Sequence, residues 1–224
     1  MSRDYILHRV RTALGRSPSQ PIPDPPPARI RIPEVSLDAR VACLLAQVEA
    51  LAGTALETSD PRACIASAIA GKTVIASNSP YLAACGISSL PGVESGITDR
   101  EQLREACATA DIGITSADYA LADTGTLVML SSPAEARMVS LLPPEHIAVV
   151  PRDRILTGLD ELFSLLPNPA EQSSSMVLIT GPSRTADIEQ ILVRGVHGPG
   201  RITVLVAAEQ GLRSVGSRGR QKGE

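Results

Sequence analysis

The alternation of helix and strand is clearest in residues 101–130, which read EQLREACATADIGITSADYALADTGTLVML. We predict a helix over residues 101–110, followed by two strands in the apolar runs 112–115 and 126–130. These runs are rich in β-branched and other apolar residues, which favour the buried positions of a sheet. Apolar strands separated by helices are typical of a mostly parallel sheet with helices on both faces. The predicted fold class is therefore α/β.

The same alternation continues outward on both sides of this stretch. Toward the N-terminus, Asp38 begins a helical pattern that ends before Gly53, and a second helix is expected over residues 61–70. Toward the C-terminus, helices are expected over residues 155–166 and 186–193. The predicted strands are 73–76, 112–115, 126–130, 146–150, 176–180 and 202–206. We expect all of them to form one sheet within one domain.

The two ends of the chain differ in composition from this predicted domain, residues 34–209. Residues 1–15 are expected to form a helical arm, because their apolar side chains recur on one helical face. These side chains are Ile6, Val10, Ala13 and Leu14. Residues 16–33 are rich in proline and predict an extended linker, and the polar tail 210–224 is expected to be disordered. Two roles stay open for the arm: packing on its own domain, or on a second copy in a homo-oligomer.

Composition argues against nucleic acid and membrane partners. The formal net charge is −3, which leaves no broad basic surface for a phosphate backbone. Only 2% of the residues are aromatic, so single-stranded bases would find little to stack on. No apolar run reaches the roughly 20 residues of a membrane span, and no secretory signal is recognisable. We therefore expect a cytoplasmic protein that binds neither nucleic acid nor a membrane.

The cysteines argue against a metal centre in this chain. Cys43, Cys64, Cys85 and Cys107 contain no CxxC pair, whereas iron–sulfur and zinc sites usually take neighbouring cysteines from one loop. Their apolar or Ala-rich surroundings predict reduced, buried thiols. The chain also lacks a GxGxxG motif after a strand, a Walker loop and an HExxH motif. We expect this chain to bind no metal and no cofactor.

Three segments are far more specific than the general α/β pattern. They are residues 115–128, TSADYALADTGTLV; residues 137–146, RMVSLLPPEH; and residues 180–189, TGPSRTADIE, continuing to GVHGP at 195–199. In this order and wording they resemble the LUD domain family, and most closely its lactate-utilisation protein C branch. The amphipathic N-terminal helix is similar to that branch as well, so the resemblance covers nearly the whole chain.

The resemblance implies more than the pattern of strands and helices does. It implies a fold similar to that of the sugar-phosphate isomerase and CoA-transferase superfamily. It also implies a component of a system that oxidises lactate to pyruvate with two iron–sulfur proteins, the clusters being held by those partners. Two other functions stay open: a free-standing enzyme of that superfamily, and a scaffold or sensor that binds a small molecule.

The loop after the predicted strand 176–180 is the first candidate site. It is expected to turn into the helix 186–193, whose free N–H groups would suit a small carboxylate or phosphate ligand. Its candidate ligand-binding residues are Gly181, Ser183, Thr185, Asp187 and Glu189. The alternative is that Ser183 or Thr185 only caps the helix, with Asp187 offsetting the helix dipole.

The turn before the predicted strand 126–130 is the second candidate. It comprises Asp123, Thr124, Gly125 and Thr126, and Gly125 would let a ligand approach the backbone closely. The alternative is a tight turn in which Asp123 bonds its own backbone. The LUD family usually has Glu at this position, and CoA-transferases use a glutamate as covalent nucleophile. The shorter Asp123 would misplace such a nucleophile, but it stays the candidate catalytic carboxylate.

Histidine and arginine side chains complete the candidate site. His197 lies in a loop crowded with glycine and proline, where it would act as general acid or base, or fix the turn through a backbone hydrogen bond. Arg137 would clamp a carboxylate, or form a surface ion pair. His146 precedes an apolar strand and is interpreted as structural. The two loops meet only if residues 117–125 fold back across the sheet edge, or if the strand 126–130 runs antiparallel.

Deleting residues 1–33 is expected to leave a folded domain, because the apolar stripe of the arm is small beside the predicted core. The measurement is urea unfolding of the truncated and full-length chains. Cooperative transitions in both would support a separate arm, whereas loss of cooperativity in the truncated chain would make the arm part of the core.

Overall fold

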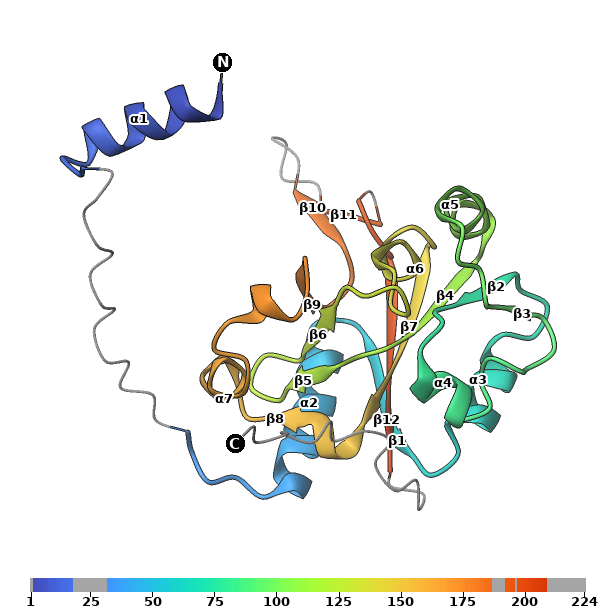
Figure 1. Cartoon of the computed structure of the whole chain (residues 1–224). Helices are drawn as coiled ribbons and strands as arrows, with labels where there is room; N and C mark the ends of the chain where they lie inside the picture. Colours follow the sequence, from blue (N-terminus) through green and yellow to red (C-terminus); the bar gives the residue numbers. More distant parts are fainter. Residues whose placement is uncertain (1, 18–31, 187–191, 196, 209–224) are drawn as a thin grey trace, which may run out of the picture. The chain divides into compact units, whose positions relative to one another are not determined.

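The computed structural model describes residues 2–17, 32–186, 192–195 and 197–208 of the chain (Figure 1). The chain divides into an N-terminal unit and a body that begins at Ile32. The N-terminal unit holds α1 (Arg3–Ala13), which the hydroxyl of Ser2 caps, and none of the residues of this helix is buried. The predicted helix of the arm is present. The predicted tail 210–224 and most of the predicted linker lie outside the described residues.

The body is built on a parallel sheet of six strands. Their order across the sheet is β1-β12-β7-β4-β2-β3, and every neighbouring pair is parallel. The strands are β1 (Thr54–Thr58), β2 (Val74–Ala76), β3 (Val93–Glu94), β4 (Ile112–Ser116), β7 (Glu145–Pro151) and β12 (Arg201–Ala207). The mostly parallel sheet that the sequence predicts is confirmed. Four of the six predicted strands lie in it, and their ends differ from the predicted ends by at most one residue.

Helices cover both faces of this sheet. They are α2 (Leu37–Ala50), α3 (Pro61–Ala68), α4 (Pro80–Ala84), α5 (Arg100–Thr109) and α6 (Arg137–Leu141). On one face, Ile65 of α3 and Leu82 of α4 pack on a layer that includes Ile114. On the other face, α2 packs over β7 and β12, while α5 and α6 pack near β2 and β4. In Figure 1, α3 and α4 lie below β2 and β3, and α2 lies to the left of β12. No described helix is long and apolar enough to cross a membrane.

A second, mixed sheet covers the same face as α2. Its order is β8 (Ile155–Leu156), β5 (Tyr119–Leu121), β6 (Thr126–Leu130) and β9 (Met176–Thr180), and β6 is antiparallel to both of its neighbours. The prediction that 126–130 and 176–180 join the parallel sheet is therefore wrong. The connection between β4 and β6 is too short for the crossover of a dozen or more residues that parallel neighbours need. The chain instead turns back through β5 and starts a new sheet.

Two of the predicted helices differ from the structure. The prediction of a helix over 186–193 is wrong at its two described ends, where Ala186 belongs to the strand β10 (Arg184–Ala186) and residues 192–193 belong to the antiparallel strand β11 (Leu192–Arg194). Residues 187–191 lie outside the described residues. The predicted helix 155–166 begins later, as α7 (Leu159–Leu165), because Ile155 and Leu156 are buried and pair with β5. Short 3-10 turns, η1 (Arg152–Arg154) and η2 (Pro169–Glu171), flank this region.

The path of the chain reverses direction between β2 and β4. After β2 the chain moves outward through α4 to the edge strand β3, whereas after β4 it moves inward toward β7. Open α/β sheets bind ligands outside the carboxyl ends of the strands at such a reversal, because the two connections leave on opposite faces. The loops that follow β2 and β4 are therefore the place in this fold where a site is expected.

Gly113 in β4 sets how closely α6 approaches the sheet. A Cβ atom at this position would overlap the backbone carbonyl of Val139 in α6 and lie 3.1 Å from Pro143. Neither neighbour is the free end of a flexible side chain, so only glycine fits without moving the helix. This contact fixes α6 and the loop that leads into it.

Replacing Gly113 by alanine is expected to lower the free energy of unfolding by about 3 kcal/mol, since an overpacked core must shift backbone. Gly92→Ala is the control: Gly92 has φ +84° and open space around it, so only backbone strain of about 1 kcal/mol applies. Urea unfolding of both variants measures the difference. An equal cost for the two would show that α6 can move away from β4.

Candidate functional site

The structure brings the two predicted loops together at one end of the mixed sheet. Thr126 begins β6 and Thr180 ends β9, and these residues are direct partners in the antiparallel pair. Their hydroxyl oxygens are 2.8 Å apart, and Thr126 Oγ1 also donates to Thr124 Oγ1 at 2.8 Å. Of the two routes by which the loops could meet, the antiparallel strand is the one that the fold uses.

The glycines of both loops are explained by packing against the end of α2. A Cβ atom at Gly125 would lie 3.0 Å from Gln47, and one at Gly181 would lie 3.0 Å from Leu51. Both glycines also have positive φ angles, +66° and +76°. Arg184 donates a hydrogen bond to the carbonyl of Leu51, which ties the second loop to the same helix end. A structural role therefore accounts for the distinctive glycines.

Ser183 and the loop around His197 lie side by side. The amide of Ser183 donates to the carbonyl of Pro199 at 2.9 Å, and the amide of Gly195 donates to the carbonyl of Ser183 at 3.0 Å. His197 is exposed beside this contact. Arg184 to Ala186 form a strand, so the predicted helix does not begin at Ala186. The rest of that helix start, with the anion site predicted for it, lies outside the described residues. Asp187, Glu189 and the side chain of Thr185 lie outside what the structure describes.

Asp123 and Arg137 are both exposed. Asp123 accepts a hydrogen bond from the Thr124 hydroxyl at 3.2 Å, and its amide donates to the carbonyl of Thr157 at 3.1 Å. Its carboxylate lies against Gly158, where a Cβ atom would be 2.5 Å from Asp123 Oδ2. Asp123 thus faces the start of α7, whereas Ser183 faces the loop around His197. Arg137 begins α6, and its side chain makes no hydrogen bond or ion pair with another described residue.

A cluster that the sequence reasoning missed lies at the carboxyl ends of β2 and β4. Glu135 Oε1 accepts hydrogen bonds from the amide of Ser116 at 3.0 Å and from its hydroxyl at 2.5 Å. The Ser116 hydroxyl is also 2.6 Å from the hydroxyl of Ser79. Ser77 follows β2 directly and is buried. We call Ser77, Ser79, Ser116 and Glu135 the edge cluster.

Local hydrogen bonds position each member of the edge cluster. The Ser132 hydroxyl accepts from the amide of Glu135 at 3.0 Å, which closes the loop after β6. The Ser79 hydroxyl accepts from the amide of Tyr81 and caps α4. Between Ser77 and Ser79, the side chain of Asn78 donates to the carbonyl of Ile97 and accepts from the amide of Gly96, so both of its polar atoms are bonded. The cluster is therefore held from three loops.

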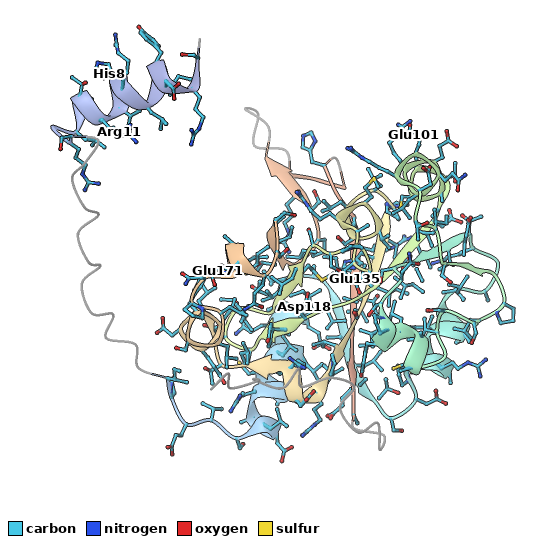
Figure 2. The ribbon with its side chains drawn as sticks, in the orientation of Figure 1. His8, Arg11, Glu101, Asp118, Glu135 and Glu171 are labelled. Carbon is cyan, nitrogen blue, oxygen red and sulfur yellow. The ribbon has the colours of Figure 1, made fainter. Side chains whose placement is uncertain are left out.

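The edge cluster contains a carboxyl group in an environment that disfavours its charge. Burial raises the pKa of Glu135, the hydrogen bonds from Ser116 and the nearby Ser77 hydroxyl lower it, and the negative charge of Asp118 raises it. Burial also raises the pKa of Asp118, against the hydrogen bond from the amide of Leu130 and the positive charge of Arg154. Figure 2 shows Asp118 and Glu135 in the same part of the body. Carboxyl groups with raised pKa values at a topological reversal make this edge of the sheet a candidate functional site.

A sequence signal for this cluster existed, but only in part. Ser77, Ser79 and Ser116 follow the ends of two strands that were predicted within one residue, so their shared edge could have been inferred. Glu135 carries no such signal. It comes from a loop beyond a hairpin, and only the tertiary fold places it over Ser116.

His146 and the cysteines belong to the packed interior. His146 is fully buried in β7, its Nε2 is 2.8 Å from the Thr115 hydroxyl, and burial lowers its pKa to about 4. Cys107 is buried, which raises the pKa of its thiol to about 11, whereas the other three cysteines are only half-buried. All four are free thiols. Across the described ranges, no group of three or more His, Cys, Asp or Glu residues could hold a metal ion.

Comparison with known proteins points to one family. The family model of the LUD domain matches residues 57–207. The lactate utilization protein C of Halalkalibacterium halodurans is 42% identical over 117 residues, which cover 50% of this chain and 51% of that protein. The lactate utilization protein C of Geobacillus thermodenitrificans is 29% identical over 234 residues, 93% of this chain and 97% of that protein.

The extent of these similarities differs between relatives. This chain spans about half the length of the Halalkalibacterium protein and of two similar relatives, whereas the match to the Geobacillus protein runs nearly end to end. A crystal structure of a DUF162 family protein from Deinococcus radiodurans has a TM-score of 0.59 at 18% identity, covering 78% of this chain and 99% of that chain. This structural likeness supports the fold.

The stability of the protein is expected to fall between pH 6.5 and pH 4 because of His146. The unfolded imidazole, with a pKa near 6.5, takes up a proton in this range, whereas the folded one does not until about pH 4. Protons therefore favour the unfolded state, by up to about 3 kcal/mol at pH 4. The measurement is urea unfolding against pH for the parent and for His146→Gln, which does not titrate. Parallel pH profiles for the two proteins would contradict this assignment.

Proposed function

The chain belongs to the LUD domain family, and from that premise we propose that it is a component of a lactate-utilisation system. In this system lactate is oxidised to pyruvate together with iron–sulfur partner proteins. The observation that carries the proposal is the similarity to a lactate utilization protein C along 93% of this chain.

The chemistry of the side chains supports a system in which partner proteins accept the electrons and this chain binds the acid. Oxidation of lactate to pyruvate releases two electrons and two protons, so it needs an electron acceptor. Within the described part of the chain the cysteines and other ligand-type residues form no group of three, the minimum expected of a cluster site. We assign the electron acceptor to iron–sulfur clusters on the partners. The side chains of this chain would bind the acid and accept the protons that it releases.

The exposed residues around His197 are the surface that we assign to ligand or partner contact in this role. Ser183 bonds the loop that carries His197, and neither residue is part of a hydrophobic core cluster. Replacement of either by alanine is therefore expected to change stability by less than about 1 kcal/mol.

The test is lactate-dependent reduction of a dye by purified iron–sulfur partners with and without this chain. We expect a rate only with the chain present, and a reduced rate with His197→Ala or Ser183→Ala. Ser164→Ala is the matched control, since Ser164 is exposed and bonds only the carbonyl of Asp160 within its own helix. Equal rates with and without the chain would refute the proposal. Turnover of lactate by the isolated chain would favour a free-standing enzyme instead.

A further inference from the structure

The edge cluster contains two buried polar atoms that lack a hydrogen bond to any described residue. They are Ser77 Oγ, in a residue that is 3% exposed, and Glu135 Oε2, in a residue that is 9% exposed. The Ser77 hydroxyl is near enough to lower the pKa of Glu135, yet it makes no hydrogen bond of normal geometry to the carboxyl. An unpaired buried polar group costs about 1–3 kcal/mol, so these two neighbouring groups suit a bound hydrogen-bonding partner.

The free oxygen of Glu135 has a fixed position. The other oxygen, Oε1, accepts from both the amide and the hydroxyl of Ser116, so the carboxyl cannot rotate without losing two hydrogen bonds. Oε2 must therefore point away from Ser116. A ligand group that both donates and accepts could bond Glu135 Oε2 and Ser77 Oγ at the same time, and a hydroxyl group is the smallest one that does so.

Ser77 and Glu135 lie close to the protein surface and close in sequence to the cationic side chain of Arg137. Ser116, Asp118 and Asn78 are only half-buried, so the pair lies close beneath the surface. Arg137 follows Glu135 by two residues, a span of at most about 7 Å between Cα atoms. Its exposed guanidinium has no partner among the described residues and is free to pair with a carboxylate.

We propose that Ser77 and Glu135 bind the hydroxyl group of a small 2-hydroxy acid, and that Arg137 pairs with the carboxylate of that acid. The hydroxyl donates to Glu135 Oε2 and accepts from Ser77 Oγ. The choice of lactate as the acid rests on the proposed function, whereas the recognition of a hydroxyl group rests on the geometry. A phosphate fits less well, because it would place up to two negative charges beside Glu135 and Asp118.

The experiment measures binding of lactate and propionate to the full-length chain by isothermal titration, with both lactate enantiomers. Propionate has the same carboxylate and carbon chain but no hydroxyl. We expect one lactate enantiomer to bind at least tenfold more tightly than propionate, which corresponds to about 1.4 kcal/mol. Ser77→Ala and Glu135→Gln should abolish this preference, and Arg137→Ala should lower the affinity for both lactate and propionate.

Glu135→Gln is a selective change because of the Ser116 amide. That amide requires a carbonyl oxygen opposite it, so the glutamine NH2 group must take the place of Oε2 and replace the acceptor by a donor. The matched controls are Glu171→Gln and Ser89→Ala, both at exposed positions away from the cluster, which should leave the preference unchanged. Thermal unfolding of each variant separates a lost contact from a lost fold.

Three outcomes would overturn the inference. Equal affinities for lactate and propionate would show that the protein does not recognise the hydroxyl group. If the folded Ser77→Ala and Glu135→Gln variants prefer lactate over propionate as strongly as the parent does, the site lies elsewhere. If the parent binds neither acid, Ser77 and Glu135 do not bind a 2-hydroxy acid. The proposed function fails separately: if these residues bind lactate but the partners oxidise lactate equally well without the chain, the site stands and the function does not.

Discussion

The approach of α6 to β4 at Gly113 is the contact on which the edge cluster depends. Because no Cβ atom separates the strand from the carbonyl of Val139, the helix lies directly on the sheet. The loop that precedes α6 then lies close to the end of β4, and the hydrogen bond from the amide of Glu135 to the Ser132 hydroxyl stabilises this loop. In this position Glu135 reaches the amide and hydroxyl of Ser116. A glycine in the middle of a strand thus determines where a carboxyl group is buried at the edge of that strand.

The mixed sheet has a different role, which is to connect distant parts of the chain. The side chains of Thr124, Thr126 and Thr180 form a continuous line of hydroxyls between the turn before β6 and the end of β9. The end of α2 packs on the glycine in each loop. These residues are the most distinctive of the sequence, and packing explains most of them. What remains available for recognition is the exposed rim, with Asp123 on one side and His197 on the other.

The sequence predicted local structure well and failed where distant contacts decide. The parallel strands and the helices α2, α3 and α5 follow from apolar periodicity and capping residues, which are local properties. The split into two sheets depends on the short connection between β4 and β6, a property of the sequence that apolar periodicity does not take into account. The ends of the helix predicted for 186–193 are wrong because Arg184 to Ala186 pair with β11, and periodicity cannot detect such pairing. Glu135 could not be found at all, since its hydrogen-bond partner Ser116 comes from another element.

The position of β12 has a consequence for how the protein is made. This strand comes last in the described chain, yet it lies inside the sheet, between β1 and β7. While the ribosome is still translating residues before Arg201, the facing edges of β1 and β7 have no partner. Unpaired strand edges invite pairing with other chains. The sheet can close only after synthesis of Ala207, through contacts of high sequence separation that make folding slow. Newly made chains therefore pass through a state that needs protection from aggregation.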